Sequence, residues 1–474
     1  MNNTLFNNKY DKLIEPLYGI KRNIVEDQIL LQDNIVPSTY NICDRVDMTK
    51  QSIYSIDPEG CEDADDAFSI YEENDKLLLA IHIADPTEHI NIGSSLWKNI
   101  EQNVVTRYPS NKKPIHMMPN EIMEKASLMV NQYGDIKLAI TILTEIDKET
   151  YQPRGKVKLL FTKIKVSKNN ALSYMNAGKS IESNIVLSNG LKISKSLQNL
   201  RSQKTKGVVL NEISLSFPKY DNLNNTSHLY LDSATEISMK QMIAEFAIFA
   251  NSFIGEYLKI NFDGTGLYRI CSAKDWLNTV YSEISGQELL NEIIVNGIKA
   301  EYISTVSPHD LVGAPEYTHF TSPIRRLSDC VCHYLLKYIH LKNTIHDLCV
   351  PFTNDQLMKY SNDCVRLTKS IKNIQYKDTK FRIIQTINNM LMNNENVTIQ
   401  YYVTSYTGLY LNIIICNINE HCVYLSYTLR ISDLQTKYEI KLVKSLDITH
   451  VNCIDKFDEG TIPELDNVFI TKSV

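Results

Sequence analysis

The sequence predicts an α+β protein, in which a large domain with a mixed sheet surrounded by helices precedes a small β-barrel. Three observations support this. Strand-like apolar runs recur between residues 54 and 166, helical periodicity dominates roughly 170 to 385, and short strands return after residue 396. The chain has 474 residues, enough for two or three domains, one of them large.

The predicted order of domains follows these changes of pattern. Residues 1–53 include the apolar patch DQILLQDNIV and are too few for a large domain, so we expect an N-terminal extension that packs on the core. Residues 54–387 form the large domain and 397–474 the small one. The Asn-rich stretch NNMLMNNEN (388–396) between them is typical of a linker.

Strands are predicted first, at LLLAIHIAD (77–85), KLAITILTEID (137–147) and KVKLLFTKIKV (156–166). The first is almost continuously apolar, as expected for a strand covered on both faces. Long helices are predicted at 237–260, 322–341 and 355–390. The short strands VTIQYYV, LYLNIIIC, CVYLSYTL, KYEIKLV and DNVFITK then suit a small barrel such as an OB-fold.

Composition limits the class of protein and its partners. The net charge of -6 gives no general attraction to nucleic acid or to an anionic membrane, so either would need a local basic patch. No apolar run is long enough to span a bilayer, and the N-terminus lacks an apolar signal region. The ten cysteines form no CxxC pair, which argues against structural zinc; we expect buried thiols and a cytoplasmic location.

The stretch SIDPEGCEDADDAF (55–68) crowds acidic groups between apolar strands. In one compact loop, Asp57, Asp63, Asp65 and Asp66 would repel one another and raise each other's pKa. Divalent cations such as Mg²⁺ remove that conflict, and two ions about 4 Å apart would make a phosphodiester-cleaving site. The alternative is an exposed acidic turn. An EF-hand calcium site fits poorly, because this stretch lacks the alternating ligands of that motif.

A second informative stretch is EYTHFTSPIRRLSDCVCHYLL (316–336). Ser322 is a good N-cap and Pro323 a good first helical residue, which would put Arg325 and Arg326 in the first turn. Cations are disfavoured there unless an anion such as phosphate is bound at that end. The alternative is a solvent-facing arginine pair.

Two weaker patterns accompany these motifs. Glu245 borders an apolar stripe of the helix MIAEFAIFANSF, so it either serves the site or is an ordinary paired or edge-exposed glutamate. Arg154, Lys156 and Lys158 share one strand face, as do Lys163 and Lys165, and such faces would line a nucleic-acid channel or simply face solvent.

These residues together resemble the ribonuclease II/ribonuclease R (RNB) family. IDPEGCEDADDA matches the family's acidic pattern, YTHFTSPIRRLSD its arginine segment and MIAEFAIFAN its Glu-containing helix. IHIADPTEHI and VVTRYPSNKKPIHMMP resemble further family segments. The resemblance covers about 45 to 390 in order, and 395 to 474 more weakly.

The resemblance implies a 3′→5′ hydrolytic exoribonuclease that releases nucleoside 5′-monophosphates from single-stranded RNA. It implies that Asp57, Asp63, Asp65 and Asp66 hold two Mg²⁺ ions and an attacking water, with Asp65 and Arg325 catalytic. Contacts to RNA are implied for the following residues: Tyr108, Tyr174, Glu245, Thr321, Ser322 and Arg326.

The chain also departs from the family pattern. Leu327 replaces a common aromatic, the Arg-Gly pair before Tyr108 is absent, and MetMetPro replaces MetLeuPro. The N-terminal extension is too short for two cold-shock-type OB domains, so grip on RNA is expected from the C-terminal barrel or from a partner protein. We expect a monomer. The rival hypotheses are a catalytically silent RNA-binding scaffold and a metal-dependent DNA exonuclease or other phosphodiesterase.

Overall fold

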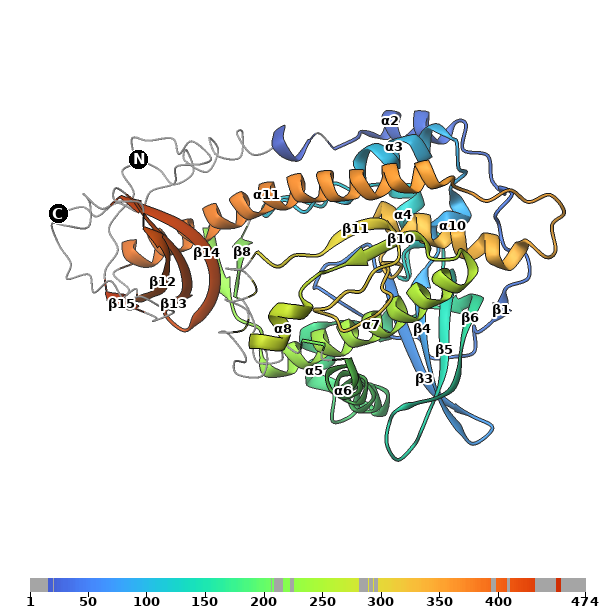
Figure 1. Cartoon of the computed structure of the whole chain (residues 1–474), viewed down its shortest axis with the longest axis horizontal. Helices are drawn as coiled ribbons and strands as arrows, with labels where there is room; N and C mark the ends of the chain where they lie inside the picture. Colours follow the sequence, from blue (N-terminus) through green and yellow to red (C-terminus); the bar gives the residue numbers. More distant parts are fainter. Residues whose placement is uncertain are drawn as a thin grey trace.

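A computed structural model describes residues 16–19, 21–205, 207–208, 216–221, 226–280, 289, 293, 297–393, 398–406, 410–430 and 449–452. The largest sheet lies at one end of the molecule and a smaller sheet at the other (Figure 1). Helix α11 (Asn354–Met392) runs between them.

The largest sheet has five strands in the order β1-β6-β5-β4-β3. They are β1 (Val46–Asp47), β3 (Asp66–Glu73), β4 (Lys76–Ala84), β5 (Ile136–Ile146) and β6 (Pro153–Lys165). Strand β1 is parallel to β6 and the other pairs are antiparallel, so the predicted mixed sheet is confirmed. The residues of β4 are buried on both faces, as its apolar run predicts.

A short parallel pair brings distant segments of the chain together. Strand β2 (Ser55–Asp57) pairs with β7 (Ala171–Ser173), which places Asp57 opposite Ser173. Ser173 caps helix α5 (Tyr174–Ser180) by accepting a hydrogen bond from the N–H of Asn176. The pairing therefore sets the first acidic residue of the 55–68 stretch beside the start of α5.

Three long helices cover this core. Helix α7 (Ala234–Asn261) begins with a capping box of Ser233 and Glu236, and its Phe246 ring lies 5.4 Å from that of Phe68 on β3. Helix α10 (Leu327–Leu341) is buried along most of its length. Helix α11 continues through the first part of the predicted linker, because buried residues such as Ile387 keep that turn packed; the predicted start of the linker at 388 is wrong.

The remaining elements connect these layers. The helical ones are α2 (Ile24–Leu31), η1 (Pro86–His89), α3 (Ser95–Asn103), α4 (Asn120–Ala126), η2 (Lys168–Asn170), α6 (Ile185–Thr205) and α8 (Lys274–Val280). Two hairpins pair β8 (Phe217–Asp221) with β9 (Thr226–Tyr230) and β10 (Thr265–Ile270) with β11 (Glu301–Thr305).

The C-terminal part contains an antiparallel sheet in the order β14-β13-β12-β15. Its strands are β12 (Thr398–Tyr406), β13 (Tyr410–Ile418), β14 (His421–Arg430) and β15 (Thr449–Asn452). Three predicted strands are confirmed, whereas those at 437–443 and 466–472 lie outside the described residues. A closed OB-fold barrel therefore stays a prediction.

A charged cluster is buried beneath helix α10. Lys337 lies 2.6 Å from Glu88 and 3.1 Å from Asp85, and Arg45 lies 2.5 Å from Asp85. The Asp85 and Lys337 side chains are fully buried. Because unpaired charges are costly in the interior, this cluster fastens α10 to the segment after β4.

Two further predictions can be compared with the described residues. Cys271, Cys330, Cys332 and Cys364 are buried thiols as expected, but Cys43 and Cys349 are exposed because they lie in surface connections. In the part of the chain that the structure describes, every helix is too short or too polar to cross a membrane.

Candidate active site

The acidic stretch forms a compact loop between β2 and β3. Asp57 ends β2 and Asp66 begins β3. The loop backbone is held by the N–H of Leu128, which donates to the Ala64 carbonyl, and by that of Ala84, which donates to the Asp65 carbonyl. Asp65 is buried, and the other three aspartates are half-buried. The loop therefore gathers the carboxylates instead of spreading them in solvent.

Burial raises the pKa values of the Asp57, Asp65 and Asp66 carboxyl groups. The pKa of Asp57 rises to about 7, first because it is buried and then because Asp66 and Asp63 are negative. Burial raises the pKa of Asp66 to about 6 against the opposing effect of Arg325. Burial also raises the pKa of Asp65 strongly. Gathering these carboxyl groups in one loop therefore opposes their ionisation, and a bound cation would remove that conflict.

Asp65 is bound to the arginine segment. Its Oδ2 accepts a hydrogen bond from Arg325 Nε at 3.0 Å, and its Oδ1 accepts one from the N–H of Ile324 at 2.7 Å. Arg325 also donates from Nη2 to Ser322 Oγ at 2.9 Å, while 46% of its side chain stays exposed. The structure therefore brings the two predicted catalytic residues together and leaves part of the guanidinium facing solvent.

The expected helix start at Ser322 is wrong. Helix α10 begins at Leu327, and Arg325 lies in the preceding turn. The side chain of Asp329 explains the difference, since its Oδ1 accepts from the Ser322 N–H at 2.7 Å and from Arg326 Nη2 at 2.8 Å. Arg325 is therefore presented by a turn, and no helix N-terminus supports an anion beside it in the way the sequence suggested.

Three residues that were predicted to contact RNA make contacts within the protein. Thr321 and Ser322 are buried, and Thr321 Oγ1 accepts from Asn251 Nδ2 at 3.4 Å. Arg326 is paired with buried Asp329. Their observed contacts shape the turn that holds Arg325.

Tyr108 lies beside the acidic loop. Its hydroxyl donates to Asp63 Oδ2 at 3.3 Å, and 39% of the residue is exposed. The segment before it pairs with the arginine turn, because the Thr106 N–H donates to the Arg325 carbonyl at 3.0 Å and the Leu327 N–H to the Val104 carbonyl at 2.8 Å. Burial and nearby Asp63 raise the pKa of Tyr108. An exposed aromatic ring thus borders the carboxylates.

Tyr174, the first residue of α5, also faces the aspartates: burial and then Asp66 and Asp57 raise its pKa. Lys240 Nζ lies 5.5 Å from the Tyr174 ring centre and 5.3 Å from that of Phe217, which is 41% exposed. Sequence patterns did not single out Lys240 or Phe217, because they lie on separate elements, α7 and β8.

Glu245 is buried and paired. Arg201 on α6 contacts it twice, at 2.6 Å and 3.2 Å. No hydrogen bond or ion pair within the described chain joins Glu245 to the four aspartates, so the structure shows a paired glutamate near the core of α7. Arg201 was missed because nothing in its local sequence marks it.

The basic strand face lies away from the site. The Thr162 end of β6 lies at the same end of the sheet as the start of β3, because Thr162 pairs with Ala139 and Ala139 pairs with Ala84. Arg154 pairs with Glu145 at the opposite end of the sheet. Arg154, Lys156 and Lys158 are exposed there. The described strands favour the solvent-facing alternative.

The carboxylate groups also bear on whether the site suits a metal ion. Among the described residues, the structure contains no group of three or more His, Cys, Asp or Glu side chains arranged to hold a metal ion. Asp57 Oδ2, however, is buried and has no hydrogen-bond partner in the structure. An orphaned carboxylate oxygen among other carboxylates fits a hard cation such as Mg²⁺, which takes one or two carboxylates and keeps several waters.

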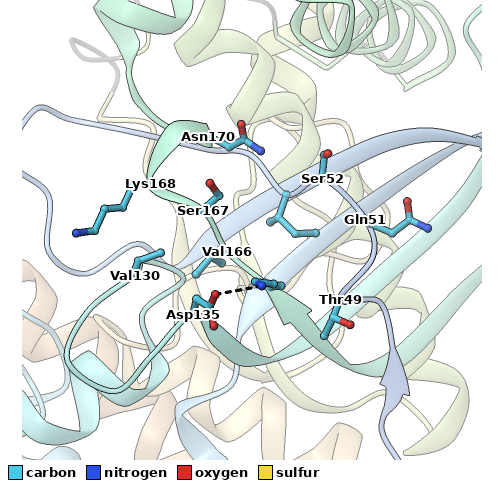
Figure 2. A pocket seen from close by; sticks show the side chains of 11 residues that line it. Thr49, Gln51, Ser52, Val130, Asp135, Val166, Ser167, Lys168 and Asn170 are labelled. Atoms are coloured by element: carbon cyan, nitrogen blue, oxygen red, sulfur yellow. Dashed lines mark ion pairs between the residues drawn. The ribbon is translucent and has the colours of Figure 1, made fainter.

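A separate pocket of about 460 Å³ is lined by residues that include Asp135, Lys165 and Ser167. Figure 2 shows that residues just before β2 and β7, including Ser52 and Ser167, contribute to its wall, with the Asp135–Lys165 ion pair of 3.5 Å. The four aspartates and Arg325 do not line it, so this pocket is distinct from the carboxylate site.

Residues 45–342 match the RNB domain, and the chain belongs to the RNB family. Among curated relatives it is 20% identical over 401 residues to Ribonuclease R of Mycoplasmopsis pulmonis, covering 76% of this chain and 54% of the relative. It is 27% identical over 338 residues to Exoribonuclease 2 of Buchnera aphidicola, covering 62% and 50%. The chain thus spans about half the length of these two relatives.

Solved structures share the fold. An active-site mutant of the Dss1 exoribonuclease from Candida glabrata superposes with a TM-score of 0.70 at 18% identity, over 87% of this chain and 54% of that one. RNase R of Mycoplasma genitalium in complex with ribose methylated single-stranded RNA gives 0.68 at 18%, over 87% and 69%. Yeast Ssd1, a pseudonuclease, gives 0.59 at 17%, over 78% and 49%.

Proposed function

We propose that this chain is a metal-dependent 3′→5′ exoribonuclease that hydrolyses single-stranded RNA to nucleoside 5′-monophosphates. The observation that carries the proposal is the contact between Asp65 and Arg325 beside the unpartnered Asp57 carboxylate oxygen. Carboxylates for a cation and a half-exposed guanidinium for an anion suit the two sides of a phosphodiester.

Asp57, Asp63 and Asp66 would hold two Mg²⁺ ions, with Asp65 contributing once its contact to Arg325 adjusts. Bound Mg²⁺ supplies Lewis acidity and lowers the pKa of coordinated water. Asp65 keeps Arg325 at the site through the Nε contact, and the exposed part of the guanidinium stabilises negative charge on the phosphate.

The 3′-terminal nucleotides are proposed to stack on aromatic rings that border the carboxylates. Tyr108 and Phe217 are both about two-fifths exposed, and Lys240, which is ion-paired with Asp232, lies close to the Phe217 and Tyr174 rings. Stacking on exposed rings is tolerant of sequence and suits a single strand. Thr321, Ser322 and Arg326 support the substrate indirectly, by shaping the Arg325 turn, and Glu245 does so through its pair with Arg201.

The test is product analysis. The purified protein is incubated with RNA labelled at the 3′ or the 5′ end, with and without Mg²⁺, alongside DNA of the same sequence. We expect labelled mononucleotide at once from the 3′ label, a shortening ladder from the 5′ label, no product without metal, and slower cleavage of DNA. Preferred cleavage of DNA, or internal cuts, would contradict the proposal.

A second candidate function is that of a silent RNA-binding scaffold, favoured by the fold shared with the pseudonuclease Ssd1. The retained carboxylates argue against it, because repelling buried charges lower stability when they serve no cation. RNA binding with no Mg²⁺-dependent product in the same assay would establish it instead.

A further inference from the structure

A histidine that the motifs did not single out points into the acidic loop. His116 is 8% exposed, and its Nδ1 lies 3.7 Å from Asp63 Oδ2. That nitrogen is buried and has no hydrogen-bond partner in the structure. The carboxylate site therefore has two buried, unpartnered polar atoms, Asp57 Oδ2 and His116 Nδ1.

The backbone fixes His116 from both sides. The Ile115 N–H donates to the Arg107 carbonyl at 2.9 Å, and the Met117 N–H donates to Thr106 Oγ1 at 3.1 Å. The His116 carbonyl accepts from Arg22 Nη2 at 3.2 Å. These contacts hold the residue on the same segment that presents Tyr108.

Neither neutral tautomer of His116 is satisfied by Asp63 alone. With hydrogen on Nδ1, the 3.7 Å separation exceeds a hydrogen bond of about 2.7–3.2 Å. With hydrogen on Nε2, the Nδ1 lone pair faces an anionic oxygen. Imidazole binds metals in its neutral form, through a ring nitrogen that carries no hydrogen.

A cation between the two side chains resolves this arrangement. In an octahedral site, two neighbouring ligand atoms that each lie about 2.1 Å from the ion are about 3.0 Å apart, so a small approach of the two groups from the observed 3.7 Å lets both bind one ion. The other contacts of Asp63 are weak: Cys61 Sγ donates to Oδ1 at 3.4 Å and the Tyr108 hydroxyl to Oδ2 at 3.3 Å.

We propose that His116 Nδ1 joins Asp63 as a ligand of a divalent ion, and that this nitrogen makes the site favour Mn²⁺ over Mg²⁺. Mg²⁺ prefers oxygen donors, whereas first-row transition metals accept imidazole readily. The inference rests on the metal dependence in the proposed function and adds a determinant of metal choice to it.

The test uses untagged, metal-stripped full-length protein without RNA. Mn²⁺ is added at less than one equivalent, and pulsed electron paramagnetic resonance records coupling of the ion to nitrogen-14. We expect nitrogen coupling in the wild type, its loss in His116→Gln, and its retention in His346→Gln, an exposed control. Calorimetry should show Mn²⁺ binding that weakens by about tenfold or more in His116→Gln, with a smaller change for Mg²⁺.

The wild-type spectrum is decisive even if His116→Gln folds poorly, which circular dichroism and thermal melting would reveal. Bound Mn²⁺ without nitrogen coupling, or coupling that persists in a folded His116→Gln, overturns the role of His116 while leaving a carboxylate metal site intact. Absence of Mn²⁺ binding overturns it too, and the labelled-RNA assay then decides separately whether the proposed exonuclease function fails.

Discussion

Asp65 and Arg325 are 260 positions apart in the chain and are joined by an ion pair of 3.0 Å. The Ile324 N–H donates a hydrogen bond to the same carboxylate and so fixes the turn that carries the arginine. This contact ties the acidic loop after β2 to the segment before α10. The geometry of the site therefore depends on how these two segments dock, and several consequences can be measured.

Replacing Arg325 with Lys should reduce kcat about 10²–10³-fold, because lysine keeps the charge but loses the planar Nε contact to Asp65. Single-turnover cleavage of labelled RNA measures the effect. Arg366→Lys is the matched control, since that side chain is 68% exposed and pairs with its helical neighbour Asp363. A rate within threefold of wild type for Arg325→Lys would show that the arginine takes no part in the chemical step.

Ser110→Ala should raise KM about fivefold and leave kcat within twofold. Ser110 lies two residues after Tyr108, and its N–H and hydroxyl donate to Asp378 on α11 at 2.8 Å and 2.6 Å. The substitution removes two hydrogen bonds of the hydroxyl, the one it donates to Asp378 and the one it accepts from Arg382 Nε at 2.9 Å. Each costs about 1 kcal/mol to lose, and their loss loosens the tyrosine segment. Steady-state kinetics on RNA gives the two constants.

The control for this prediction is a double-mutant cycle. In a Tyr108→Ala background, Ser110→Ala should change KM little, because the ring it positions is gone. Equal effects in both backgrounds would show that Ser110 supports stability in general and not the tyrosine.

Lys337→Met should lower the free energy of unfolding by about 3–5 kcal/mol. The substitution leaves Asp85 and Glu88 buried with fewer positive partners. Urea titration followed by circular dichroism measures the change, and Lys342→Met, an exposed lysine at the end of the same helix, serves as the control. A loss below 1 kcal/mol would mean that the remaining cations compensate.

Acid should destabilise the sheet through His82. This residue is fully buried between Ser69 Oγ and Thr141 Oγ1, and burial lowers its pKa from 6.5 to about 3. Between those values only the unfolded state binds the proton. Stability from this group is therefore complete above pH 6.5 and decreases by up to about 1.4 kcal/mol per pH unit as the pH falls toward 3.

The measurement compares unfolding free energies of wild type and His82→Asn from pH 7.5 to 4.5. The variant should show the shallower slope over this window. Parallel slopes would place the acid sensitivity in other groups.

Much of the fold could be predicted because local patterns determine it. Apolar runs defined β4 and β5, and helical periodicity defined α7 and most of α11. The compact acidic loop followed from the crowding of carboxylates next to an apolar strand. These features depend on residues close together in sequence.

The predictions that were wrong concern features that depend on contacts between distant residues. Ser322 and Pro323 have the local character of a helix start, but Asp329 binds the Ser322 N–H and the strand-like pairing of Val105 with Arg326 delays the helix to Leu327. The pairing of Glu245 with Arg201, and the attachment of Ser110 to Asp378, join separate elements in the same way. Patterns within one element carry no information about such partners.

The most direct measurement of the central claim is made on Asp65→Asn, by fluorescence anisotropy with single-stranded RNA and by single-turnover cleavage in Mg²⁺ on the same preparation. If the carboxylate cluster and Arg325 form a hydrolytic site, RNA affinity should stay within about threefold of wild type while cleavage falls at least about 10³-fold. Cleavage at the wild-type rate by this variant would contradict the account.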